Sequence, residues 1–355
     1  MKRQLILLLP RIDKNVFSVQ ALLARQDLYA SYLAHKQGGS YQKAIAFYSG
    51  TEAPVRPSSL SFIEPIWLGS TKLNLFSFFI KSIQYLKHIK DTRIILVAGT
   101  PFQPLLIARL ISARFSNSVI QVSIHGELAS VEKSWLKYLF LKSQLSKVSS
   151  LRFVSEAQRI DFCRESRFAS IPSVITPVPI NTEITRAASD MRINLGFVGR
   201  IHEERDPLSW AAIANSLPDM PNLVVGDGPL FGEMRTNLKR GEFTGALDGA
   251  QLESVWPRIK VLLSTAPYES YGLTIREALL HGVPVVAKTS AGARALASRF
   301  PNLVRLFEER EQATTLIREL LDSPPTQNEF NSFKDWFVRK QEESLRALAE
   351  LWDEM

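Results

Sequence analysis

The chain has 355 residues, of which 45% are hydrophobic, and it carries a formal net charge of +8. That length and composition are typical of a water-soluble protein with two ordinary domains, each large enough for its own core. The apolar run at residues 5–9 ends at Pro10 and is too short for a signal peptide, and no run approaches the roughly 18 apolar residues that span a bilayer. The single cysteine, Cys163, excludes an internal disulfide, and we expect a cytoplasmic protein.

The charge is distributed unevenly along the chain. Residues 1–190 carry a net charge of +12, whereas residues 191–355 carry −4. A basic first half indicates an anionic partner, either a membrane surface or a nucleic acid. The basicity therefore bears on partners more than on fold.

Short β-branched or leucine-rich runs alternate with longer helical patterns along the whole chain. This alternation predicts parallel sheets built from βαβ units, hence an α/β fold with two doubly wound, Rossmann-like domains. We expect domains at 1–180 and 191–328, a linker within the proline-rich stretch 177–190, and a final helix over 329–355 that crosses back to the first domain. Strands are predicted at 5–9, 44–48, 94–98, 119–124, 152–154 and 174–175, and again at 193–198, 223–225, 243, 261–263, 283–287 and 303–306.

Two segments of the first half interleave lysines with aromatic and aliphatic residues. They cover residues 71–90 and 131–147, and each reads as a basic amphipathic helix. Such helices can lie on anionic lipid, although a core-facing helix with lysines in solvent has the same pattern. Together with the basic first half, they favour attachment to an anionic membrane surface over nucleic-acid binding.

His125 directly follows the predicted strand 119–124. It therefore stands at a carboxyl strand end, where ligands bind in open α/β sheets. A structural histidine and an active-site histidine are equally compatible with this position.

The second half carries polar groups after successive strands. Gly199 permits a ligand to approach the backbone closely. Arg200 and Arg205 can bind a diphosphate with their planar, forked guanidinium groups. Gly226 and Gly228 form a tight turn after the next strand, compatible with a bound base or with an ordinary connection.

Residues 267–286 are the most informative stretch. They predict a strand end and turn with Glu269, a helix containing Glu277, and a second buried strand after Gly282. Two carboxylates near a helix N-terminus suit a phosphorylated sugar carried on a ribose, because the helix end attracts phosphate and carboxylates accept hydrogen bonds from hydroxyls.

Several common catalytic motifs are missing. The sequence has no Gly-x4-Gly-Lys-[Ser/Thr] loop, no complete Gly-x-Gly-x-x-Gly, no Gly-x-Ser-x-Gly, no His-Glu-x-x-His and no Asp-x-Asp pair for a divalent metal. We therefore expect no metal and no cofactor, and arginines and helix dipoles would neutralise a leaving phosphate.

The second half resembles the donor-binding domain of retaining glycosyltransferases with the GT-B fold, family 4. The resemblance rests on ordered motifs: Phe-Val-Gly-Arg at 197–200, Gly-Asp-Gly-Pro at 226–229, Phe-Thr-Gly at 243–245, the Glu269-x7-Glu277 pair and Gly-Val-Pro-Val-Val at 282–286.

The resemblance implies a role for each matching residue. Arg200 and Arg205 would bind the donor diphosphate, Glu269 the sugar hydroxyls and Glu277 the ribose. Gly199, Gly226 and Gly228 would leave room for the nucleotide, His125 would line the catalytic cleft, and the backbone of Ser270, Tyr271, Gly272 and Leu273 would lie close to sugar and phosphate.

The chain departs from the family pattern at several places. Arg205 replaces the usual lysine, Asp206 the following glycine, and 291–294 the usual double glycine and acid. The loop 10–17 lacks the glycine pair that normally approaches the donor phosphate, so that Asn15, Arg11 or Lys14 would substitute for it.

These features predict a retaining, metal-independent glycosyltransferase of the cell envelope. It would move a sugar from a nucleotide-diphosphate sugar to a lipid-linked or polysaccharide acceptor, with peripheral attachment at the inner membrane face. The alternatives are a nucleotide-sugar epimerase or hydrolase, and a nucleotide-sugar-binding protein without transferase activity. The sugar, the base and the acceptor are not specified by the sequence.

Overall fold

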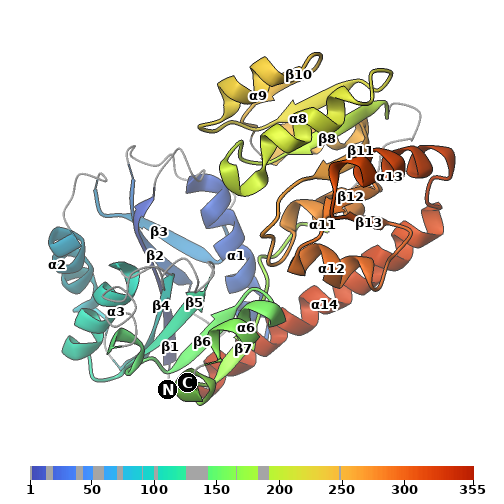
Figure 1. Ribbon diagram of the computed structural model, residues 1–355. Coiled ribbons are helices and arrows are strands. Elements are labelled where there is room, and N and C mark those ends of the chain that lie inside the picture. Colours follow the sequence, from blue (N-terminus) through green and yellow to red (C-terminus); the bar gives the residue numbers. More distant parts are fainter. Residues whose placement is uncertain are drawn as a thin grey trace. The chain divides into compact units, whose positions relative to one another are not determined.

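The computed structural model describes residues 2–12, 19–36, 43–50, 60–69, 75–89, 91–99, 103–124, 143–164, 166–182, 192–247 and 249–355. Contacts divide the chain into two compact units, one formed by Met1–Pro179 with Gln341–Met355 and the other by Ile180–Lys340. Each unit has a parallel sheet with helices on both faces (Figure 1). The α/β prediction is thus confirmed in both halves of the chain.

The sheet of the first unit has the strand order β3-β2-β1-β4-β5-β6-β7. Its strands and helices are β1 (Lys2–Ile12), α1 (Val19–Lys36), β2 (Ala44–Gly50), β3 (Ile63–Trp67), α2 (Leu75–Leu86), β4 (Thr92–Gly99), α3 (Gln103–Arg114), β5 (Ser118–Ile124), β6 (Ser150–Phe153), α6 (Glu156–Phe162), α7 (Ser166–Ala169) and β7 (Ser173–Ile175).

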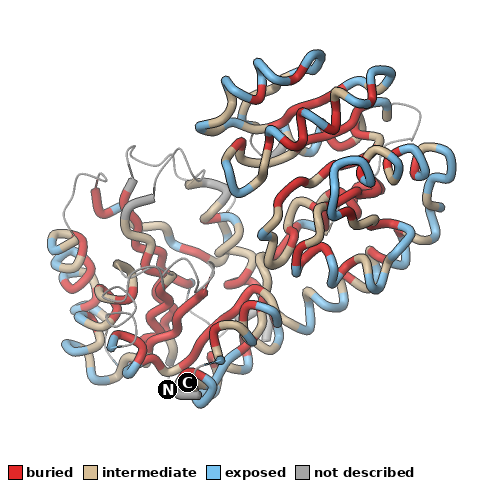
Figure 2. Tube along the Cα trace, viewed as in Figure 1, coloured by how far each residue is buried: buried red, intermediate tan, exposed pale blue. Residues whose placement is uncertain are grey.

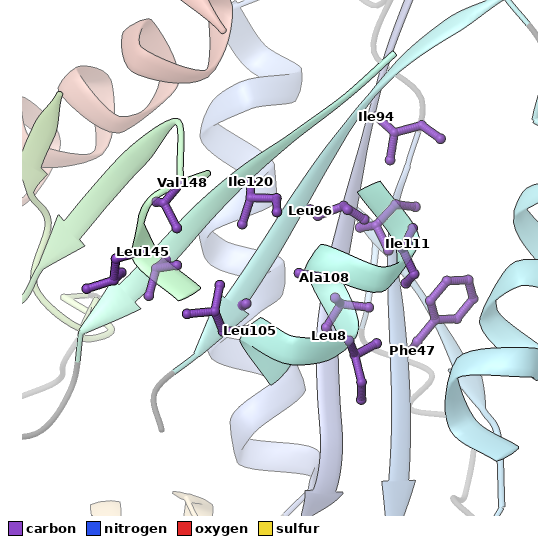
Figure 3. Packing of buried hydrophobic residues seen from close by; sticks show 14 of the residues in the cluster. Leu8, Phe47, Ile94, Leu96, Leu105, Ala108, Ile111, Ile120, Leu145 and Val148 are labelled. Carbon is purple, nitrogen blue, oxygen red and sulfur yellow. The ribbon is translucent and has the colours of Figure 1, made fainter. Parts of the chain in front are cut away.

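Alternation along β1 builds a core on each face of this sheet. Ile6 and Leu8 join the cluster under α2 and α3, whereas Leu5 and Leu7 join the cluster under α1 and the end of the last helix. Successive side chains of a strand point to opposite faces, and burial of one leucine contributes about 1.5–3 kcal/mol. Figure 3 shows Leu8 packed with Leu105 and Ala108 of α3 in the first of these clusters.

The first unit differs from the sequence-based expectation in two strands. The edge strand β3 was not predicted, because Pro65 interrupts its pattern; an edge strand tolerates proline, which cannot donate to the ladder. Strand β1 continues past its expected end at Leu9 to Ile12, with an irregular register between Leu9 and Ile12. This irregularity accommodates Pro10, which has no N–H to donate to the sheet.

The second unit has the strand order β10-β9-β8-β11-β12-β13. All six of its predicted strands are present. Its elements are β8 (Asn194–Val198), the 3-10 turn η2 (Glu203–Arg205), α8 (Pro207–Asn215), β9 (Asn222–Val225), α9 (Phe231–Asn237), β10 (Glu242–Gly245), α10 (Gly249–Val255), the 3-10 turn η3 (Trp256–Arg258), β11 (Ile259–Ser264), α11 (Leu273–Leu280), β12 (Val285–Lys288), α12 (Ala291–Ala297), β13 (Val304–Phe307), α13 (Arg310–Asp322) and α14 (Gln327–Glu354).

Buried residues follow the strands of the second sheet, and exposed ones follow the outer faces of its helices (Figure 2). The strand order reverses between β8 and β11, so the connections that follow these two strands run in opposite directions. That point is where ligands bind in doubly wound folds. This rule predicts a ligand site at the loops after β8 and β11.

The last helix, α14, contributes to both cores. Phe330, Phe333 and Phe337 pack in the second unit under α11 and α12. Leu348 and Trp352 pack in the first unit against the same face as α1. The amphipathic pattern of this helix thus supports two separate apolar clusters.

Candidate donor-binding site

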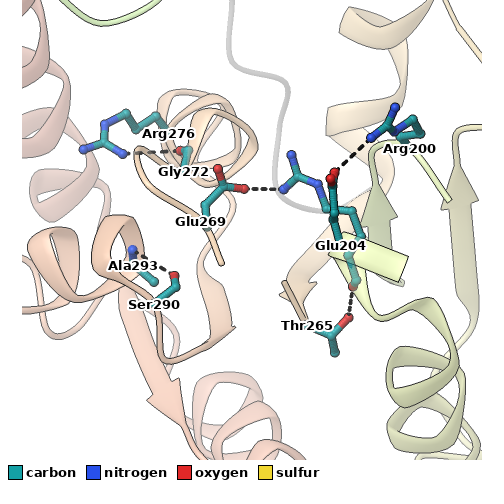
Figure 4. A network of polar contacts seen from close by, with 9 residues as sticks. Arg200, Glu204, Thr265, Glu269, Gly272, Arg276, Ser290 and Ala293 are labelled. Atoms are coloured by element: carbon teal, nitrogen blue, oxygen red, sulfur yellow. Dashed lines mark hydrogen bonds and ion pairs between the residues drawn. The ribbon is translucent and has the colours of Figure 1, made fainter. Parts of the chain in front are cut away.

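The loop after β8 carries the first group of predicted site residues. Gly199 has φ +143 and its N–H donates to the Val225 carbonyl at 3.0 Å. Arg200 pairs with Glu204 at 2.9 Å on the surface of the same loop (Figure 4). Because exposed ion pairs contribute little to stability, Arg200 can exchange this partner for a phosphate at small cost.

Arg205 is held more firmly than Arg200. The Thr265 hydroxyl lies 2.7 Å from the Arg205 carbonyl oxygen and 2.9 Å from the Asp206 carbonyl oxygen and shares its one proton between them, which ties the loop to the end of β11. Asp206 has φ 44, and its carboxylate accepts the Ser209 N–H at 3.2 Å as the N-cap of α8. Aspartate is one of the few side chains that tolerate this left-handed region, so the backbone expected of a glycine is retained.

The turn after β9 packs directly on the loop after β8. Gly226 and Gly228 have φ +139 and +157, and a β-carbon on Gly228 would lie 2.4 Å from the Ile201 carbonyl oxygen. Packing therefore requires glycine, which has no β-carbon, at these positions. The predicted contact of these glycines with a nucleotide stays a prediction.

The loop after β11 places Glu269 opposite Arg205. Their side chains form an ion pair, with 14% of the Glu269 side chain exposed. The pair joins the loops after β8 and β11, across the point where the strand order reverses. The structure thus brings together a cation and a carboxylate that are 64 residues apart in sequence.

The same loop leads into the N-terminus of α11. Gly272 is the N-cap with φ 75, and no side chain of the described residues caps this end. The first N–H groups of a helix have no partner within the helix, so they offer a site for an anion. Ser270 and Tyr271 are partly buried, and Leu273 begins the helix.

Glu277 lies in α11, roughly 7 Å further along the helix axis than Gly272. It is partly buried, and its backbone carbonyl accepts the His281 N–H at 3.1 Å. The His281 ring contacts the Glu277 carbonyl through Nδ1 at 2.7 Å and Glu253 through Nε2 at 2.6 Å. These contacts fix the C-terminal end of α11.

His125 lies outside the described residues, as do Asn15, Lys14 and the side chain of Arg11. Their predicted roles stay predictions. Among the described residues no group of three or more His, Cys, Asp or Glu could hold a metal ion. No described helix is long and apolar enough to cross a membrane.

One buried residue of this region was missed by the sequence reasoning. Arg276 is 6% exposed, donates to the Gly272 carbonyl at 3.4 Å and lies with its guanidinium carbon 3.7 Å from the centre of the Tyr271 ring. Burial lowers the pKa of Arg276, while Tyr271 and Glu269 act in the opposite direction. The available signal was its position on the apolar face of the helix, one turn before Leu279 and Leu280.

A cavity of about 530 Å³ opens elsewhere in the second unit, lined by Arg192, Ile193 and Lys260 among others. These residues precede or begin β8 and β11, at the sheet edge opposite the Arg205–Glu269 pair. We place the candidate site at the carboxyl edge, because the arginines, the carboxylates and the uncapped helix N-terminus all lie there.

Residues 192–322 match the family described as glycosyl transferases group 1. The second unit is therefore a domain of the group 1 glycosyltransferase family. A GDP-mannose-dependent alpha-mannosyltransferase from Mycolicibacterium smegmatis is 34% identical over 109 residues, 31% of this chain and 29% of the relative. A 2-deoxystreptamine glucosyltransferase from Streptomyces kanamyceticus is 29% identical over 41% of this chain and 40% of the relative. The match thus spans well under half of either relative's length.

Solved structures resemble the whole chain. A sucrose-phosphate synthase from Thermosynechococcus elongatus has a TM-score of 0.76 at 17% identity, with 99% of each chain covered. The Anabaena protein HepE in complex with UDP has a TM-score of 0.70 at 16% identity, with 100% of each chain covered. The fold is the GT-B fold of these glycosyltransferase neighbours, which confirms the predicted fold.

Proposed function

We propose that the protein is a retaining glycosyltransferase that takes its sugar from a nucleotide-diphosphate sugar. The observation that carries this proposal is the Arg205–Glu269 ion pair at the reversal of strand order, beside the uncapped N-terminus of α11. A cation, a carboxylate and free helix N–H groups match the phosphate and hydroxyl groups of such a donor. The names of the relatives support the donor class, since they include a GDP-mannose-dependent enzyme and a UDP complex.

The diphosphate would bind Arg205, Arg200 and the first N–H groups of α11. Glu269 would accept hydrogen bonds from the sugar hydroxyls and Glu277 from the ribose. The backbone of Gly199, Gly226 and Gly228 would lie against the nucleotide. Each assignment follows from the family resemblance, and the positions of Arg205 and Glu269 on facing loops support it.

In the route to retention that we propose, the bond between the anomeric carbon and the phosphate oxygen breaks as the acceptor oxygen attacks from the same face. The acceptor proton then passes to the departing phosphate, which leaves as a nucleoside diphosphate. We propose that the arginines and the α11 dipole stabilise its charge without a metal ion. His125 would line the cleft in which this occurs.

The acceptor is proposed to be a lipid-linked or polysaccharide chain at the cytoplasmic membrane face. Helix α2 supports this, because Phe76 is 68% and Ile80 37% exposed, one turn apart on the same face. Lys87 and His88 are exposed just beyond the helix end. Aromatic and aliphatic groups on the helix, with basic groups just beyond its end, suit the surface of an anionic bilayer.

Sedimentation with vesicles tests the membrane part. The full chain should sediment with phosphatidylcholine vesicles that contain phosphatidylglycerol, more strongly at low than at high salt, because salt screens the charge attraction. A Phe76→Ser, Ile80→Ser variant should sediment less, with an exposed Leu208→Ser variant of the second unit as control. Absence of wild-type binding at both salt concentrations would contradict the membrane proposal.

Product analysis tests the reaction. Incubation with UDP-glucose or GDP-mannose and a mixture of membrane-derived acceptors should yield a glycosylated product with the donor's anomeric configuration and free nucleoside diphosphate. Glu277→Ala should sharply reduce donor binding and turnover. Conversion of the donor alone to an epimer would favour an epimerase, and donor binding without transfer would favour a binding protein.

A further inference from the structure

Arg276 occupies an unusual place for a cation. It is 6% exposed and belongs to α11, one residue before Glu277. Its guanidinium lies over the Tyr271 ring at 3.7 Å and donates to the Gly272 carbonyl at 3.4 Å. A buried charge is destabilising unless its surroundings compensate it, so this arrangement requires an explanation beyond helix packing.

The compensation comes from the loop that carries Glu269. Tyr271 and Gly272 belong to that loop, and the Glu269 carboxylate acts electrostatically on Arg276 without a direct hydrogen bond to it. An arginine over an aromatic ring gains cation–π attraction, which is larger when both groups are removed from water. Arg276 is therefore bound to the loop through the ring, the carbonyl and the charge of Glu269.

The loop also has a second support, from α12. The Gly292 N–H donates to the Glu269 carbonyl at 2.6 Å, and a β-carbon on Gly292 would lie 2.7 Å from the Tyr271 carbonyl carbon. Backbone packs here against backbone, so residues 269–272 are held by α11 and α12 together. Contacts other than the Arg205 ion pair thus also hold this loop.

We propose that Arg276 is a positioning residue for Glu269 and that it acts on recognition of the donor sugar. This inference rests on the proposed function, in which Arg205 binds the donor diphosphate and Glu269 the sugar hydroxyls, and it adds that the diphosphate draws Arg205 away from Glu269. The carboxylate would then lose its direct ion-pair partner. Arg276, already fixed behind the loop, keeps the carboxylate compensated and aimed at the sugar hydroxyls.

Binding of the sugar part of the donor can be measured separately from binding of its nucleoside diphosphate part. Loss of Arg276 should weaken binding of the sugar part of the donor and leave the nucleoside diphosphate part nearly unchanged. Calorimetry of the full chain with UDP and UDP-glucose, and with GDP and GDP-mannose, measures this separation as the ratio of the two dissociation constants. A residue that only stabilised the fold would not change the ratio.

The chain offers a matched control. Arg152 in the first unit is also buried, lies 4.1 Å from the Tyr29 ring centre and donates to the Thr176 carbonyl at 2.9 Å. Arg276→Met should weaken binding of the nucleotide sugar by about 10-fold to 100-fold relative to binding of the nucleoside diphosphate, as expected for a lost interaction with a charged group. Arg152→Met should leave the ratio as in the wild type.

Arg276→Lys provides a second variant in case Arg276→Met does not fold. It keeps the charge but loses the planar group over Tyr271, so the ratio should change in the same direction and by less. In a Glu269→Gln background, Arg276→Lys should change the ratio little further, because its effect passes through Glu269.

Two results would overturn this inference without contradicting the proposed function. In the first, the wild type binds the donor, but the Arg276 variants weaken binding of UDP and of UDP-glucose equally. In the second, an Arg276 substitution changes the ratio of dissociation constants as much in the Glu269→Gln background as in the wild type. Failure of the wild type to bind any of the four nucleotides would instead contradict the proposed function.

Discussion

Gly226 packs against Gly199 so closely that a β-carbon on Gly226 would lie 1.9 Å from the Gly199 carbonyl oxygen. The contact holds the turn after β9 against the loop after β8. Both glycines also have positive φ, which side chains other than glycine rarely adopt. Two loops that would contact the nucleotide therefore share one backbone interface.

Replacement of Gly226 by alanine should destabilise the second unit. Overpacking and backbone strain together predict a loss of about 2 kcal/mol or more in the free energy of unfolding, measured by urea denaturation. Gly232→Ala is the control, because Gly232 lies in α9 with open space around its missing β-carbon. That variant should be unchanged or more stable by less than about 1 kcal/mol. Equal stability of the two variants would contradict the packing account.

Docking of α14 on the first unit should depend on a buried hydrogen bond. The Trp352 indole N–H donates to the Gln121 side-chain oxygen at 2.9 Å, and both residues are buried. Trp352→Phe leaves the glutamine without this partner, which should lower the free energy of unfolding by about 1–3 kcal/mol. Trp67→Phe at a site that is 40% exposed should have a much smaller effect. Equal effects in thermal denaturation would argue against a specific role of this bond.

The start of α14 should make stability depend on pH. Hydrogen bonds from Asn302 and Thr326 lower the pKa of Glu329. A carboxylate whose pKa is lower in the folded state stabilises the fold above its unfolded pKa of about 4.3, and the contribution is lost as the pH falls through the folded pKa. Glu329→Gln should be less stable than wild type by about 0.2–1 kcal/mol at pH 7, because water screens this exposed charge, and the difference should shrink in acid.

The matched control for this cap is Glu342→Gln, an exposed position of the same helix. The Glu329→Gln difference from wild type should change more between pH 7 and pH 3 than the Glu342→Gln difference does. Equal changes in the two differences would show that the cap does not act through its charge.

The sequence predicted the parts of this protein that follow from local pattern. Alternating strands and helices specified the two doubly wound sheets, and positions after strands brought Arg205 and Glu269 to one edge. Strand β3 was missed because Pro65 breaks the strand pattern, although an edge position tolerates it.

Arg276 was missed for a different reason. Its helical position carries no motif, and its partners Tyr271 and Gly272 are identified only when the loop folds back over α11. Long-range electrostatic compensation of a buried charge is a tertiary property, so a single sequence does not reveal it.

The proposed function assigns Arg205 to a nucleoside-diphosphate site. Calorimetric titration of UDP and GDP into the wild-type chain, Arg205→Met and Arg258→Met measures whether Arg205 binds the diphosphate. Arg258 is the control, because it pairs with Glu242 on the surface of the same unit. We expect wild type and Arg258→Met to bind at least one nucleotide with equal affinity, and Arg205→Met to bind it about 10-fold to 100-fold more weakly. Equal affinity of all three proteins, or no binding by the wild type, would contradict this assignment.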